Sequence, residues 1–149
     1  MVEVLSADRG SADSLLSSKD IVGNKVVSVK GRDAGSVEGF FFEDDSVVGL
    51  EVAYDTTMYF VDISYVTEYT KEAVMLSIQP FYVLEGLNVY DDAGRYLGTA
   101  TDVTRQGTSN ALEEIVVKRH MFSKALSIPA SDIDTAHDSI MLSYEYDNE

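Results

Sequence analysis

The segment GNKVVSVKGRDAG, residues 23–35, recurs as GLNVYDDAGRYLG at residues 86–98. Three glycines, one valine and one arginine coincide between the two copies at a constant offset of 63 residues. A repeat of roughly half the chain predicts two small units of similar fold. We expect the six glycines to be structural turn residues, and they are Gly23, Gly31, Gly35, Gly86, Gly94 and Gly98.

Short runs of alternating apolar residues surround both copies and predict strands. In the first half we expect strands at residues 25–29, 36–43, 48–54, 58–63 and 74–77. In the second half we expect them at residues 89–90, 96–104, 114–118, 125–128 and 140–143. Gly and Asp turns between such short strands favour an all-β fold made of two tandem small β-barrels related by internal duplication.

These patterns divide the chain of 149 residues into four parts. We expect a flexible N-terminal tail, a first barrel, a second barrel that starts at Pro80, and an acidic C-terminal tail, at residues 1–14, 15–79, 80–143 and 144–149. Before the first glycine, Ser17 or Ser18 is expected to cap a single helical turn that presents Leu16 and Ile21 inward.

The chain is strongly acidic, with 26 acidic and 11 basic residues and a net charge of -15. Such a surface repels phosphate backbones and anionic lipid headgroups, so we expect no nucleic-acid partner and only indirect membrane attachment, through a partner. The acidity fits either a saline cytoplasm or an acidic binding surface. The chain has no cysteine and no apolar run of 18 residues, which favours a cytoplasmic protein.

The sequence offers no pattern for catalysis or for a cofactor. His120 and His137 are the only histidines, and neither is spaced with other ligands as a metal site requires. The acidic pairs Asp44-Asp45 and Asp91-Asp92 are typical of solvated turns. Serines are present without a nucleophile elbow. We therefore expect no catalytic, cofactor-binding or metal-binding residues and no enzyme activity.

Two groups of residues are candidates for a partner interface. Neighbours on a strand point to opposite faces, so one aromatic side chain in each aromatic run should face outward. The aromatic candidates are Phe40, Phe42, Tyr59 and Phe60, although the other barrel could cover their face. The basic candidates are Arg105, Lys118 and Arg119, close in sequence to His120 and Lys124; they could meet an acidic partner or balance Glu113 and Glu114.

The order of motifs resembles the PRC-barrel family. The resemblance is carried by LLSSKDIVG at residues 15–23, GRDAG at 31–35, GLEV at 49–52, VDISYV at 61–66 and IPASDI at 128–133. It covers about residues 15–143 as two tandem copies, and the first copy departs from the family pattern with Asp62 where a proline is usual. The resemblance implies two PRC-type barrels.

PRC barrels act as adaptor modules, so the resemblance implies protein binding without catalysis. A stand-alone acidic tandem form is similar to the archaeal PRC-barrel proteins of cell division, which work with SepF, the membrane anchor of the FtsZ ring. We therefore expect a SepF-like partner, recruitment to mid-cell, and a homodimer or a pairing with a related PRC-barrel paralogue. The alternatives are a RimM-like factor that binds a ribosomal protein or RNA, and a small-molecule or metal sensor.

Overall fold

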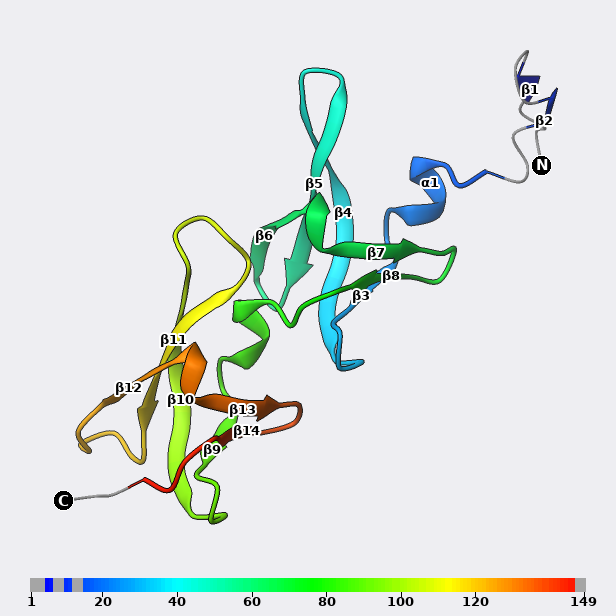
Figure 1. Cartoon of the computed structure of the whole chain (residues 1–149). Coiled ribbons are helices and arrows are strands. Elements are labelled where there is room, and N and C mark those ends of the chain that lie inside the picture. The colour runs from blue at the N-terminus through cyan, green and yellow to red at the C-terminus, as the bar shows by residue number, and fades with distance from the viewer. Residues whose placement is uncertain (1–4, 7–9, 12–14, 147–149) are drawn as a thin grey trace. The chain divides into compact units, whose positions relative to one another are not determined.

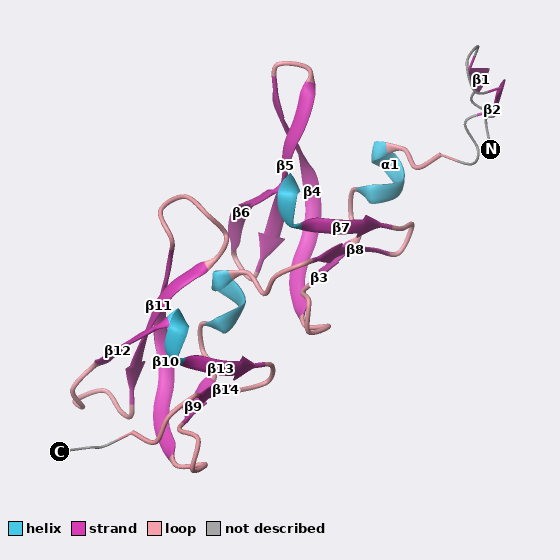
Figure 2. Cartoon of the chain, in the orientation of Figure 1, coloured by secondary structure: helices cyan, strands magenta, loops and turns pink. Residues whose placement is uncertain are grey.

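A computed structural model describes residues 5–6, 10–11 and 15–146 of the chain. Contacts divide the chain into two compact units. The first comprises the residues up to 27 together with 33–77, and the second comprises 28–32 together with the residues from 78 onward. Each unit holds one six-stranded sheet (Figure 1). The helices in the described part of the chain are single short turns beside these sheets (Figure 2).

The sheet of the first unit has the strand order β6-β5-β4-β3-β8-β7. All its neighbouring strands are antiparallel except β3 and β8, which are parallel. In chain order its elements are α1 (Ser18–Ile21), β3 (Lys25–Val27), β4 (Asp33–Glu43), β5 (Ser46–Tyr54), β6 (Thr57–Asp62), the 3-10 helix η1 (Ile63–Tyr65), β7 (Val66–Tyr69) and β8 (Ala73–Leu76).

The second unit repeats this topology, with the order β12-β11-β10-β9-β14-β13 and one parallel pair, β9 with β14. Its elements are η2 (Phe81–Leu84), β9 (Asn88–Tyr90), β10 (Tyr96–Arg105), β11 (Leu112–Lys118), β12 (Leu126–Pro129), η3 (Ala130–Asp132), β13 (Ile133–Ala136) and β14 (Ile140–Leu142). The prediction of an all-β fold with two duplicated barrel-like units is confirmed by these matching sheets.

Each sheet curls around its own apolar core. The fully buried side chains occupy equivalent strands of the two units, and most are β-branched residues that pack well on a pleated sheet. They include Val26, Leu50, Val52, Val61 and Val74 in the first unit, and Val89, Ile115, Val117, Ile128 and Ile140 in the second. Burying each such side chain contributes about 1.5–3 kcal/mol to folding. Because the same kinds of residue are buried on equivalent strands, the two cores are stabilised in the same way.

Some local predictions from the sequence were wrong. Ile21 of α1 is buried, but Leu16 is 43% exposed because it precedes the N-cap Ser17 and so lies outside the helical turn. The strand predicted from residue 25 ends at Val27, since Ser28 already accepts a turn hydrogen bond from the Gly31 amide. β7 was not predicted, because a strand of four half-polar residues gives little alternation.

The chain ends lie mostly outside the described residues. Of the predicted N-terminal tail, residues 5–6 and 10–11 are described, and they pair antiparallel as strands β1 (Leu5–Ser6) and β2 (Gly10–Ser11). Of the predicted acidic C-terminal tail, Tyr144 to Tyr146 are described, and they are hydrogen-bonded to the second unit. No helix in the described residues has the length and apolar character needed to cross a membrane.

Candidate functional site

The predicted turn glycines form the framework that positions the surfaces of each unit. All six have positive φ. At two of them the neighbouring strand leaves no space for a side chain: a Cβ at Gly35 would meet the carbonyl oxygen of Ala53, and a Cβ at Gly98 would meet that of Lys118. These glycines bring β4 close to β5 and β10 close to β11, and they have a structural role.

An apolar groove lies on the first unit, between α1 and the hairpin of β4 and β5. Its volume is about 330 Å³, and it is lined by Leu16, Ser17, Ser18, Ile21, Phe40, Phe42, Val47, Ile63 and Tyr69. Phe42 is 66% exposed. The register explains this exposure: β5 pairs with β6 only from Gly49 onward, so the end of the hairpin is a two-stranded ribbon that no third strand covers.

A second apolar surface, which we call the aromatic face, consists of Phe41, Met58 and Phe60. All three side chains are exposed. The rings of Phe41 and Phe60 lie 5.3 Å apart, tilted by 51°. Gly49 makes this packing possible, because a Cβ at that position would collide with the Phe60 ring. Met58 and Phe60 alternate with Tyr59, which pairs with the buried Val52 and is half-buried.

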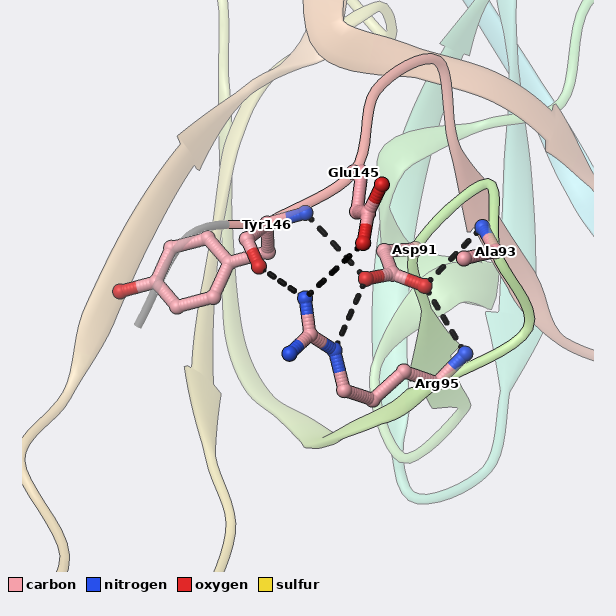
Figure 3. Close-up of polar contacts among 5 residues, drawn as sticks. All are labelled: Asp91, Ala93, Arg95, Glu145 and Tyr146. Atoms are coloured by element: carbon pink, nitrogen blue, oxygen red, sulfur yellow. Dashed lines mark hydrogen bonds and ion pairs between the residues drawn. The ribbon is translucent and has the colours of Figure 1, made fainter. Parts of the chain in front are cut away.

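In the second unit, the turn after β9 is organised by a fully buried carboxylate, Asp91 (Figure 3). Its Oδ1 accepts hydrogen bonds from the amides of Ala93 and Arg95, at 3.1 and 2.8 Å. Its Oδ2 accepts from Arg95 Nε at 3.1 Å and from the Tyr146 amide at 3.2 Å. Arg95 Nη2 donates to the Tyr146 carbonyl oxygen and lies 3.9 Å from Glu145 Oε1.

These contacts determine the charge state of Asp91. Burial alone would raise the pKa of its carboxyl group. The amides of Arg95 and Tyr146 and the Arg95 guanidinium outweigh burial and hold the pKa of Asp91 below its ordinary value. Asp91 is therefore ionised at neutral pH and holds the Tyr146 amide against the unit.

A basic pocket lies next to this network. It has a volume of about 280 Å³, and three cationic side chains line it: Arg95, Arg119 and Lys124. The remaining lining residues are Tyr96, Leu97, Val117, Ser123, Leu126 and Tyr146. Arg95 is paired with Asp91, so Arg119 and Lys124 are the side chains of this pocket that can attract an anionic group in a chain with a net charge of -15.

The basic pocket borders the connection between β11 and β12, residues 119–125, which we call the basic loop. At its tip are the two most exposed large apolar side chains in the described residues, Met121 at 80% and Phe122 at 90%. Ser123 closes the tip into a turn: its Oγ accepts from the amides of Arg119 and His120, and its amide donates to the His120 carbonyl oxygen. The loop presents Met121 and Phe122 in a defined conformation.

The structure separates the predicted interface residues. Phe40 and Phe42 line the apolar groove, whereas Phe60 belongs to the aromatic face. Arg119 lines the basic pocket and Lys118 ends β11, but Arg105 lies at the opposite end of the β10–β11 hairpin and bonds to the Thr108 carbonyl oxygen.

Two features of the second unit were not predicted from the sequence: Arg95 as a pocket residue, and the exposed pair Met121-Phe122. Arg95 was noted only as part of the repeat. The apolar pair could have been found by its position between basic residues, in the segment RHMFSK. Within the described residues, no three His, Asp or Glu side chains come together as a metal site would need. The three surfaces can offer apolar contact and attraction for anions.

Comparison with known proteins identifies one domain. None of the curated proteins matches the chain. Residues 81–148 match the PRC-barrel domain, and this range begins at η2 and includes all six strands of the second sheet. The second unit is therefore a PRC-barrel domain.

Proposed function

We propose that this protein is a non-catalytic protein–protein adaptor of the archaeal cell-division machinery, and that it docks on a SepF-like anchor of FtsZ. The observation that carries the proposal is the aromatic face of the first unit. Phe41, Met58 and Phe60 are exposed together in a chain whose net charge is -15. Exposed aromatic clusters with polar surroundings are typical of binding surfaces.

The geometry of the aromatic face suits a rigid partner. Phe41 and Phe60 are held on neighbouring strands and contact each other over Gly49, so their positions are established before binding. A partner that covers such a preorganised patch loses little additional side-chain entropy. The acidic remainder of the surface would discourage association with other anionic proteins.

The proposal also extends the family assignment. The first unit has the same strand order as the PRC-barrel domain of the second unit, with the parallel pair in the same place. This supports a second PRC barrel in the first unit, and thus a tandem PRC-barrel protein resembling the archaeal cell-division protein CdpB. The resemblance of the motifs in the first half supports the same conclusion.

The experiment compares binding of the SepF homologue of the same organism to the full chain and to two variants. Phe60→Ser removes one ring from the aromatic face and introduces the residue found at the equivalent position of β12, Ser127. We expect at least a tenfold rise in Kd, which corresponds to about 1.4 kcal/mol. The matched control Ser127→Ala should bind as the wild type does.

A second variant guards against loss of folding. Met58→Asp places a charge on the same face without removing the ring that covers Gly49, and circular dichroism reports whether each variant keeps its strands. If folded Phe60→Ser and Met58→Asp bind SepF as tightly as the wild type does, the aromatic face is not the interface. Absence of SepF binding by the wild type, with ribosomal proteins captured in its place from the native cytoplasm, would overturn the division role and favour the RimM-like alternative.

A further inference from the structure

The basic loop carries an apolar projection that the unit it belongs to does not use. Met121 and Phe122 are 80% and 90% exposed, and hydrogen bonds from Ser123 hold the turn on which they stand. Exposing two large apolar side chains to water is unfavourable, by about 1.5–3 kcal/mol for each relative to full burial. The burial of these two side chains against another surface would therefore be favourable.

The apolar groove of the first unit is a recess of matching chemistry. Its walls are mainly apolar, from Leu16 and Ile21 on one side to Phe42 and Val47 on the hairpin. The groove has a volume of about 330 Å³ and is open to solvent along the uncovered end of the hairpin. Side chains the size of Met and Phe are suited to it.

The charges around the two features are opposite. The hairpin that forms the groove ends at the exposed turn Glu43–Asp45, directly beyond the paired residues Phe42 and Val47. The basic loop has Arg119 and Lys124 on either side of its apolar tip. An apolar tip between cations and an apolar groove beside carboxylates are complementary, and such pairing orients an encounter as well as stabilising it.

The connections that form the two features differ between the units. The first unit joins β5 to β6 by two residues, Asp55 and Thr56, so it has no counterpart of the basic loop. The second unit closes its β10–β11 hairpin with the six residues 106–111, whereas the first unit has the extended ribbon that ends at residues 44–45. A contact between loop and groove therefore joins unlike surfaces.

We propose that the basic loop of one copy of this protein docks into the apolar groove of a second copy, with Met121 and Phe122 as the inserted side chains. The contact is heterologous: each copy that donates its loop keeps its own groove free, and each copy that offers its groove keeps its own loop free. Copies can therefore add head to tail. The aromatic face takes no part in this contact and stays available to the partner proposed above.

The test uses the full chain and measures mass against concentration by analytical ultracentrifugation. We expect the mass of the wild type to rise with concentration, because a contact made by one loop is small and weak. The mass should exceed that of a dimer, because a heterologous contact leaves a free loop and a free groove at the two ends. Phe122→Asp, which keeps the groove, and Phe42→Asp, which keeps the loop, should each remain monomeric alone. Their equimolar mixture should form a heterodimer that grows no further, since one intact loop meets one intact groove.

Several results would overturn the proposal. A wild type that stays monomeric at every concentration would do so, as would a symmetric dimer that survives both substitutions. A mixture of the two variants that does not associate would exclude the pairing of loop with groove. Circular dichroism checks that each variant is folded. If Phe122→Asp does not fold, Met121→Asp takes its place as the loop variant. Met58→Asp, on the aromatic face, should assemble as the wild type does while it loses binding to SepF. The assembly proposal and the SepF proposal can therefore fail independently.

Discussion

The two units share a strand order and a core but differ at the ends of their hairpins. In the first unit the connections between β4 and β5 and between β5 and β6 are two residues each. In the second unit the equivalent connections are six and seven residues, 106–111 and 119–125. The duplicated core is kept because both sheets bury the same kind of side chain, whereas the loops can differ because most of their residues are exposed. Asn110 is the buried exception. The apolar groove and the basic loop lie at these hairpin ends, so they differ between the units.

The turn after the first strand of each sheet shows the same divergence on a smaller scale. Ser28 and Asp91 occupy equivalent positions, and both are fully buried. Ser28 Oγ accepts one hydrogen bond, from the Arg32 amide at 3.1 Å. The longer, charged side chain of Asp91 accepts four and reaches the amide of Tyr146. The Asp91 side chain thus adds a contact to the C-terminal segment of the second unit.

The largest effect is expected from Gly98→Ala, because an added side chain would clash with the backbone of the neighbouring strand. The equivalent Gly35 is constrained in the same way. Gly98 has φ +140°, and an added Cβ would meet the backbone of Lys118 and Arg119, which cannot move without breaking the β10–β11 pairing. The free energy of unfolding should fall by about 3 kcal/mol. Gly35→Ala in the first unit should cost a similar amount, and denaturant melts of the two variants measure both.

The control for this prediction is Gly94→Ala. Gly94 also has a positive φ, +83°, but no atom lies within 4 Å of the site where a Cβ would be. Only the cost of the left-handed conformation remains, about 1 kcal/mol. Equal losses for Gly94→Ala and Gly98→Ala would show that backbone conformation, and not the close approach of the next strand, determines which residue these positions accept.

An intermediate effect is expected from Asp91→Ser, which gives the turn after β9 the residue found in the turn after β3. The turn itself should persist, since Ser28 supports the equivalent turn with one side-chain bond. The bonds to the Tyr146 amide and to Arg95 Nε are lost, so Tyr146 should become more mobile, whereas the bond from the Asp92 amide still holds the Tyr144 carbonyl oxygen. Hydrogen exchange at the Tyr146 amide should become faster while β9 and β10 stay protected. Ser28→Ala, in the equivalent turn after β3, should leave Tyr146 exchange unchanged.

The same substitution should alter how stability depends on pH. The folded pKa of Asp91 lies below its ordinary value of about 3.9, so its stabilising contribution is fully present above that value. The contribution is lost as pH falls through the lower, folded pKa. The difference in Tm between the wild type and Asp91→Ser should therefore be constant from pH 7 to about pH 5 and shrink below about pH 4. A difference that grows on acidification would contradict an ionised Asp91.

The sequence predicts the fold well because the fold is repeated. Turn glycines and apolar alternation occur twice in one order, so errors in any one strand do not alter the architecture. The surfaces are less predictable. Phe40 and Phe42 could be recognised as outward-facing candidates from alternation, but the groove depends on where β6 stops pairing with β5, which the sequence does not mark.

The basic side of the second unit shows the same limit. Arg119 was a candidate, yet Arg95, which lines the same pocket, is 24 residues away in the chain and comes close only through the pairing of β10 with β11. Arg105 has the same charge and lies at the other end of the hairpin. Charge in the sequence predicts which residue types matter, but strand register decides which of them converge.

The smallest effect on stability is expected from Ser123→Ala, in the basic loop that only the second unit has. Ser123 Oγ accepts hydrogen bonds from the Arg119 and His120 amides, both at 3.0 Å, and donates to the His120 carbonyl oxygen at 2.8 Å. The loop is exposed, so water replaces these bonds and the free energy of unfolding should fall by only about 1 kcal/mol. The first unit needs no such side chain, because Asp55 makes its two-residue turn with φ +56°.

The amide of His120 should exchange faster in Ser123→Ala, and head-to-tail assembly should weaken, since a loosened tip must be ordered again on docking. A stability loss as large as that of Gly98→Ala would instead mean that the loop is part of the packed structure of the second unit, and the contrast between a conserved core and divergent loops would no longer hold at this position.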